Sequence, residues 1–135
     1  MQKDYFKNID SIKFEGKESD NPLSYKYYDP NRKVMGKSLR DHFKFAMCYW
    51  HSMNDNGTDP FGRLTNLYPW NQETDVLKQA KNRADAAFEF LQKMGFDYFC
   101  FHDIDLIQEA PTLLETEKRI DQILGYIKGK QKETG

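Results

Sequence analysis

The stretch from Tyr98 to Leu106, Tyr-Phe-Cys-Phe-His-Asp-Ile-Asp-Leu, decides the fold. It opens as an unbroken apolar and aromatic run, and at His102 it becomes charged. Such a run predicts a strand buried on both faces, as in parallel sheets that are flanked by helices. Active-site groups in those sheets lie at the carboxyl ends of the strands, where His102, Asp103 and Asp105 fall. A plain strand followed by a charged loop remains the alternative.

The composition limits the class of protein. A chain of 135 residues suits one domain, and 20 Lys and Arg against 21 Asp and Glu leave it almost neutral. We therefore expect no nucleic-acid partner and no membrane partner. No apolar stretch is long enough to span a bilayer, and no signal-peptide core follows Met1. We expect a cytoplasmic protein whose Cys48 and Cys100 are reduced core residues.

A second apolar run, from Phe43 to Trp50, predicts a second strand. Its length also allows it to continue the short helix that we expect over Ser38 to His42, with Ser38 as the N-cap. The run has the same layout as the Tyr98 stretch, and this likeness favours a strand.

The two predicted strands would bring specific side chains together. Cys48 and Cys100 each lie two residues before an aromatic or titratable residue, Trp50 and His102 respectively. Because side chains alternate along a strand, each cysteine shares a face with its partner. In a parallel pair, Trp50 and His102 can therefore share one face at one end of the sheet.

Two helices are predicted from apolar periodicity. The first runs from Asp75 to Met94 and stops at Gly95. The second runs from Thr112 to Lys128, with Thr112 and Glu115 placed as a capping box. Their apolar stripes indicate core packing and not a cofactor site. The lysines at 128, 130 and 132 suit a helix C-terminus, so they need no nucleic acid to explain them.

The segment from Ser52 to Thr74 has no periodicity and is longer than most strand-to-helix loops. Within it, Phe61 lies between Pro60 and Gly62 at a turn. Its ring either folds back on its own core or projects into a pocket, including one on a neighbouring subunit.

The order of elements defines the organisation. Residues 1–42 have the pattern of an arm, and residues 43–135 that of two βα units of a parallel α/β fold. Two strands cannot bury two helix faces and two sheet faces, and stable sheets usually have at least three strands. The sequence ends where a third strand would begin, so we expect an incomplete fold that is inactive alone.

Several motifs occur together in a recognisable order. They are Tyr49-Trp50-His51, Asp59-Pro60-Phe61-Gly62, Pro69-Trp70, Ala86-Ala87-Phe88-Glu89-Phe90 and Phe99-Cys100-Phe101-His102-Asp103-Ile104-Asp105, with Gly16-Lys17 and Asn21-Pro22-Leu23 in the arm. In combination they closely resemble the N-terminal part of the longer-type xylose isomerases. The resemblance implies an arm and the first two βα units of a TIM (β/α)8 barrel. It further implies conversion of D-xylose to D-xylulose, with D-glucose as a further sugar, by a cytoplasmic homotetramer that uses two divalent ions, Mg²⁺ with Mn²⁺ or Co²⁺ as alternatives.

The resemblance also assigns roles to four residues. His102 matches the histidine that assists opening of the sugar ring, and Asp105 matches the carboxylate that holds its imidazole. This agrees with general chemistry, because a histidine that moves protons needs a partner to fix its tautomer. Trp50 matches a wall of the sugar pocket, and Phe61 matches a residue that reaches the adjoining subunit's site. The metal ligands of the family belong to later strands, and none matches a residue here.

Two departures and two alternatives accompany the resemblance. Arg63-Leu64 stands before Thr65 where small residues are common, and Ala110 replaces a glycine after Glu109. The first alternative is a non-catalytic half-barrel that serves as an interaction module. The second is a metal-dependent phosphoester-cleaving barrel, which also gathers His and Asp at strand ends.

Overall fold

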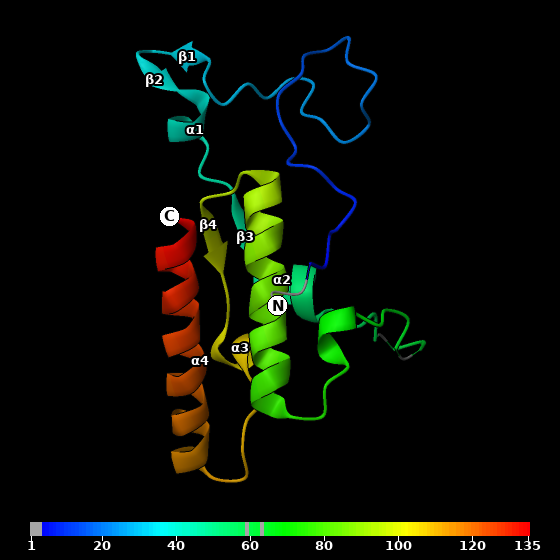
Figure 1. Ribbon diagram of the computed structural model, residues 1–135, viewed down its shortest axis with the longest axis vertical. Coiled ribbons are helices and arrows are strands. Elements are labelled where there is room, and N and C mark those ends of the chain that lie inside the picture. The colour runs from blue at the N-terminus through cyan, green and yellow to red at the C-terminus, as the bar shows by residue number, and fades with distance from the viewer. Residues whose placement is uncertain (1–3, 59, 63) are drawn as a thin grey trace.

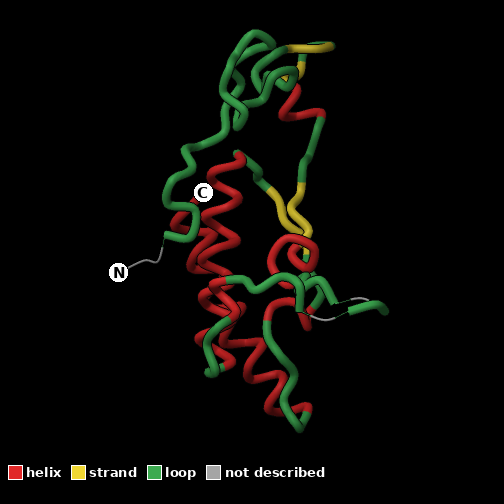
Figure 2. Tube along the Cα trace, turned by 90° about the vertical axis from the view of Figure 1, so that its right-hand side faces the viewer, coloured by secondary structure: helices red, strands yellow, loops and turns green. Residues whose placement is uncertain are grey.

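The computed structural model describes residues 4–58, 60–62 and 64–135. Two long helices lie side by side against one face of a short parallel sheet, and the N-terminal arm extends beyond one end of them (Figures 1 and 2). The elements are β1 (Lys33–Val34), β2 (Lys37–Ser38), α1 (Leu39–His42), β3 (Ala46–Cys48), the π-helix η1 (Trp50–Asn54), the 3₁₀-helix η2 (Pro69–Asn71), α2 (Val76–Met94), β4 (Tyr98–Cys100), α3 (Asp103–Leu106) and α4 (Leu113–Thr134). The chain is thus a small α/β structure.

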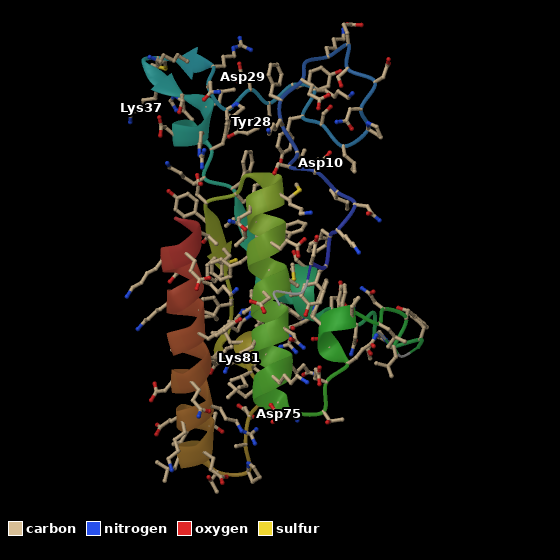
Figure 3. The ribbon with its side chains drawn as sticks, viewed as in Figure 1. Asp10, Tyr28, Asp29, Lys37, Asp75 and Lys81 are labelled. Carbon is tan, nitrogen blue, oxygen red and sulfur yellow. The ribbon has the colours of Figure 1, made fainter. Side chains whose placement is uncertain are left out.

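Helix α2 begins and ends where its sequence predicts. The Asp75 carboxylate accepts a hydrogen bond from the backbone N–H of Lys78 at 2.7 Å, which satisfies one of the first free donors of the helix. Figure 3 labels Asp75 at this end. At the other end, Gly95 adopts a left-handed conformation with φ of 68°, which closes the helix at low steric cost. The predicted helix is confirmed.

Helix α4 also begins as predicted, because the Thr112 hydroxyl accepts the backbone N–H of Glu115 at 3.3 Å. It does not end at Lys128, and that prediction is wrong: the helix continues to Thr134. Lys130 explains the extension. Its side chain is buried and pairs with Asp85 of α2 at 2.7 Å, so the last turns of α4 stay packed against α2.

The contact between α2 and α4 combines apolar packing with a polar cluster. Ile123 and Ile127 of α4 are buried, in one core cluster with small alanines of α2. Beside them, the Tyr126 hydroxyl donates to Asp85 at 2.7 Å. The Lys81 ammonium, labelled on α2 in Figure 3, lies 5.5 Å from the centroid of the Tyr126 ring. This interface forms the main core of the chain.

Strands β3 and β4 pair in parallel, and Cys48 lies opposite Cys100. The predicted pairing and register are confirmed, but the first strand is shorter than the Phe43 to Trp50 run. The backbone N–H of Asp55 donates to the Trp50 carbonyl at 2.9 Å, and this bond across five residues winds the chain into η1. The strand therefore ends before Trp50.

The sheet is covered on one face only. Met47 is buried and Phe99 half-buried on the helix side, where Phe99 packs edge-on against Phe88 of α2 at 5.6 Å. On the opposite face, Tyr98 and Cys100 are exposed. The predicted burial on both faces is wrong for this chain, because both long helices pack on the same side. For the same reason the cysteines are not core residues.

The arm is held to α2 by backbone contacts. The backbone N–H groups of Tyr5 and Phe6 donate to the Glu89 carboxylate at 2.7 and 2.9 Å. Further along the arm, Phe14 and Tyr25 form an isolated parallel β-bridge. The division of the chain after residue 42 stays a prediction.

A hairpin and a short helix complete the arm. Strands β1 and β2 are joined by Met35 and Gly36, which both have positive φ, 49° and 81°. Two such residues in succession fit the tight turn whose twist matches paired strands. Ser38 then caps α1 as predicted: its hydroxyl accepts the N–H of Asp41 at 3.1 Å.

Candidate functional site

The sequence after β4 folds back so that Asp105 meets His102. One carboxylate oxygen of Asp105 accepts the backbone N–H of His102 at 2.7 Å and lies 3.0 Å from its Nδ1. The backbone N–H of Asp105 returns a bond to the His102 carbonyl at 3.0 Å. A single turn of chain therefore places the carboxylate against the imidazole at the carboxyl end of the strand.

The two side chains differ sharply in exposure. Asp105 is 5% exposed, whereas the His102 side chain is 68% exposed. An ionised carboxylate only accepts hydrogen bonds, so its contact favours the tautomer with the proton on Nδ1. Nε2 is then the nitrogen that exchanges a proton with a ligand. The arrangement is that of an acid–base histidine oriented by a buried carboxylate.

Two side chains donate hydrogen bonds to the backbone carbonyl of Asp105. Arg83 Nη1 and Asn54 Nδ2 each donate to the Asp105 carbonyl at 2.9 Å. Arg83 Nε also donates to Asn71 Oδ1 at 3.0 Å. Burial lowers the pKa of Arg83, since desolvation disfavours its charged form. Segments η1, η2 and α2 are thus joined under the site.

Sequence reasoning missed Arg83, although a signal was present. Arg83 occupies a position on the apolar stripe of α2, next to the buried Ala80 and Ala84. An arginine on a core-facing stripe indicates a buried hydrogen-bonding partner, because such a charge is rarely buried without one. The identity of that partner, the Asp105 carbonyl, could not be read from the sequence.

Trp50 lies beside His102 as predicted. The two ring centroids are 6.3 Å apart with the planes at 76°, and the Trp50 ring stacks on His51 at 5.2 Å. Trp50 is 51% exposed. An exposed apolar ring beside a proton-exchanging group is the combination that small-ligand sites use, with aromatic walls and a few placed polar groups.

Tyr49 lies beneath this surface and was not predicted as part of it. It is buried, and its hydroxyl has no hydrogen-bond partner among the described residues. Burial is the main cause that raises the pKa of Tyr49, and the nearby Asp105 raises it further, while Arg83 opposes the shift. The Tyr49 hydroxyl therefore stays protonated at ordinary pH, and its side chain belongs to the core.

Phe61 lies on the loop between η1 and η2, which projects away from the helix pair (Figure 1). Its side chain is 97% exposed, so the ring does not fold back on the core of its own chain. Leu64, after the turn, has a positive φ of 53°, which is uncommon for a non-glycine residue. Asp59 of the quoted motif and Arg63 of its departure lie outside the described residues.

Residues 4–58, 60–62 and 64–135 include no group of three or more His, Cys, Asp or Glu side chains that could hold a metal ion. They therefore do not fit the pair of divalent ions that the sequence resemblance implies. None of the helices in the same ranges is long and apolar enough to cross a membrane.

The fold and the site together define an α/β chain with a histidine–carboxylate pair at the carboxyl end of a parallel strand. Its sequence is similar to xylose isomerases from Phocaeicola vulgatus, Bacteroides fragilis and Bacteroides thetaiotaomicron, with 50%, 47% and 46% identity over 133 residues. These matches cover 98% of this chain, and the chain spans 30% of the length of these curated relatives. No family model matches the chain.

The comparisons confirm the resemblance drawn from the motifs. The chain is a relative of proteins named xylose isomerase along almost its whole length. The partial coverage of those relatives is consistent with an N-terminal fragment of that kind of protein.

Proposed function

We propose that this chain supplies the ring-opening part of an aldose–ketose isomerase that converts D-xylose to D-xylulose. The observation that carries the proposal is the exposed imidazole of His102, held by the buried Asp105 and flanked by the exposed ring of Trp50. Relatives named xylose isomerase, at 46–50% identity, indicate the substrate class.

The proposed chemistry is proton transfer to a cyclic sugar. Opening an aldopyranose breaks the bond between the anomeric carbon and the ring oxygen, and the ring oxygen must gain a proton while the anomeric hydroxyl loses one. The protonated imidazole of His102 donates from Nε2 to the ring oxygen, and the neutral Nε2 left behind takes up, through a water molecule, the proton that the anomeric hydroxyl loses. Asp105 orients the imidazole and stabilises its charged form. Trp50 forms an apolar wall for the sugar carbons.

The remaining parts of the proposal concern a larger assembly. We propose that the chain forms the first two βα units of a TIM barrel in a cytoplasmic homotetramer, which acts on D-xylose and, as a further sugar, D-glucose. Phe61 then reaches the site of an adjoining subunit. A structure of the assembled protein that placed Phe61 nearest to the His102 of its own chain would overturn this part.

The proposed ring-opening step on this chain does not involve magnesium. The described residues do not offer a ligand set, so the isomerisation step falls to groups that they do not include. We expect Mg²⁺ to leave the melting temperature of this 135-residue chain unchanged and to confer no isomerase activity on it, as thermal melts and a xylulose assay would measure. The relatives' names favour the isomerase over a phosphoester-cleaving barrel.

The test is a chimera in which this chain replaces the matching segment of the Phocaeicola vulgatus xylose isomerase. His102→Gln in that chimera should slow the conversion of D-xylose by about ten- to ten-thousand-fold, the usual range for acid–base groups. D-Glyceraldehyde is too short to form a sugar ring, so its isomerisation should change much less.

Asp103→Asn provides the matched control, because this exposed carboxylate accepts the N–H of Ile104, whereas the imidazole of His102 is held by Asp105. Its rates should stay those of the unmodified chimera. Equal losses on both aldoses in His102→Gln would show that His102 does not act in ring opening. A chimera that assembles but is inactive would favour the interaction module.

A further inference from the structure

We propose that Arg83 and Asn54 are positioning residues for the His102–Asp105 pair, because they fix the backbone of Asp105 and through it the orientation of the imidazole. This role rests on the proposed ring-opening function of His102. The contacts that carry it join residues of this chain at the carbonyl of the buried Asp105. They therefore do not depend on what lies over the open face of the sheet.

The turn that carries Asp105 is too short to hold its own shape. Helix α3 spans only four residues, and an isolated helix shorter than about 12–15 residues is marginal in water. The carbonyls of the last turn of a helix have no partner within that helix, and the Asp105 carbonyl is one of them. Donors from other elements must therefore fix the position of Asp105.

Arg83 and Asn54 supply those donors from two different elements. Arg83 Nη1 of α2 and Asn54 Nδ2 of η1 each lie 2.9 Å from the Asp105 carbonyl oxygen, so both of its lone pairs are used. At its side-chain end, the Asp105 carboxylate accepts the backbone N–H of His102 and contacts Nδ1 of the ring. With the carbonyl fixed, the carboxylate has little freedom to turn away from the imidazole.

The guanidinium of Arg83 is itself held in one orientation. Its Nε donates to Asn71 Oδ1 at 3.0 Å, and its Nη2 donates to Gln79 Oε1 at 3.3 Å. Each nitrogen therefore has a partner, and the planar group fixes the directions of all its donors together. Rigid support of this kind is what an acid–base pair requires, because it must be held within about 0.5 Å of its productive position.

The partners of Arg83 in these bonds are neutral oxygens, namely one backbone carbonyl and two side-chain amides. Neutral oxygens do not require a cation. Replacing a buried charge by an apolar residue of similar volume is often neutral for stability. Stability alone therefore does not account for an arginine at this position, whereas a planar donor that fixes several directions at once does.

The test uses the chimera with the Phocaeicola vulgatus xylose isomerase. Arg83→Met removes the donors and keeps an unbranched side chain. It should lower kcat for D-xylose by about ten- to a hundred-fold, with little change in KM, because Arg83 acts through Asp105 and not on the sugar. The rate with D-glyceraldehyde should change much less. Asn54→Ala removes the other donor and should act in the same way, whereas Arg83→Lys restores a donor and should recover most of the rate.

Crystal structures of the same chimeras give a readout that does not depend on activity. In Arg83→Met and Asn54→Ala, the Asp105 carboxylate should move beyond about 3.5 Å from His102 Nδ1, which is out of hydrogen-bond reach. The distance in the unmodified chain is 3.0 Å. Ile127→Ala is the matched control, because it weakens the buried α2–α4 interface and takes no part in the bonds to Asp105. Its kinetics and its His102–Asp105 distance should stay unchanged.

Three results would overturn the proposal. The first is an unchanged distance between Asp105 and His102 in both donor variants, and the second is an equal loss of rate on the two aldoses. The third is a fall in kcat in Ile127→Ala as large as in Arg83→Met, which would show that lost stability slows the reaction.

Failure of the ring-opening function has a different signature. His102→Gln would then show no selective loss on D-xylose, and the distance in the crystal structures would still decide whether Arg83 and Asn54 position the pair. If Arg83→Met does not assemble, the same criteria applied to Arg83→Lys and Asn54→Ala decide the outcome.

Discussion

The two faces of the β3–β4 sheet differ in what covers them. On one face, Met47 and the half-buried Phe99 are covered by α2 and α4, whose core includes the fully buried Ile123. On the other face, Trp50 and His102 are exposed at the carboxyl end of the strands. The same two strands therefore carry a packed core on one side and reactive side chains on the other.

This difference separates the residues that hold the chain together from the residues that perform chemistry. Burial of apolar area stabilises the fold, so substitutions on the covered face should change the free energy of unfolding. Substitutions on the open face should change reactivity and leave stability almost intact. The following predictions test this separation, from the largest expected effect to the smallest.

The largest effect should come from Ile123→Ala on α4. Ile123 is completely buried between the helices, and removing its methyl and methylene groups leaves a cavity. We expect a loss of about 2–5 kcal/mol in the free energy of unfolding, measured by urea titration. Ile104→Ala removes the same atoms from an exposed position and should cost within about 0.5 kcal/mol. Equal losses for the two variants would contradict the separation of the faces.

An intermediate effect should come from Tyr5 at alkaline pH. Its hydroxyl is buried without a hydrogen-bond partner in the described parts of the chain, and its ring packs edge-on against Trp70 at 5.7 Å. Burial, and then nearby carboxylates led by Asp85, raise the pKa of Tyr5 to about 12. In the unfolded chain the pKa of this hydroxyl is 10.0, which is lower. The neutral Tyr5 side chain therefore makes its full contribution to the free energy of unfolding below pH 10. This contribution is lost as the pH rises from 10 to about 12.

Tyr5→Phe provides the check on that pH dependence. The variant has no ionisable group at this position, so its stability should fall less than that of the unmodified chain between pH 10 and pH 12. Urea titrations at both ends of this window measure the difference. Identical pH profiles for the two proteins would show that the Tyr5 hydroxyl is already exposed.

The smallest effect should come from the ion pair between Arg40 and Asp97, which links α1 to the turn before β4. Arg40 Nε donates to Asp97 at 2.7 Å, but both side chains are largely exposed. Asp97→Asn should cost about 0–1 kcal/mol, and less at high salt. The hydrogen bond from Arg40 lowers the pKa of Asp97, so the contribution is present above pH 3.8 and is lost as the pH falls further. A loss as large as that of Ile123→Ala would show that the arm carries stability that its contacts do not explain.

The helices were predictable because their end signals are local. Asp75, Gly95 and Thr112 act on backbone groups within four residues, so their effect can be read directly from the sequence. The end of α4 could not be read in this way, because Lys130 keeps the helix packed through Asp85, a residue distant in the sequence. From the sequence alone, a lysine near a helix end is compatible both with a helix that ends there and with a helix that continues.

The strands and the site were predictable only in part. The pairing of Cys48 with Cys100 follows from the similar layout of two apolar runs, but that layout does not show that η1 begins at Trp50. The contact of His102 with Asp105 was implied by the resemblance to xylose isomerases and not by the apolar pattern, and the structure contains it. The support of the Asp105 carbonyl by Arg83 depends on how the helix packs, which apolar periodicity alone does not specify.

The buried pair of Lys130 and Asp85 has a consequence for how the helices align. The apolar stripe of α4 repeats every turn, so a slide of α4 along α2 by one turn, about 5.4 Å, would replace one isoleucine or leucine contact with another. The same slide would carry the Lys130 ammonium away from Asp85, and the half-buried Asp85 carboxylate would lose this cation. The ion pair and the Tyr126 hydroxyl therefore select one sliding position among several that the apolar side chains would accept. That position fixes where α4 begins, and with it the short segment that leads back to Asp105.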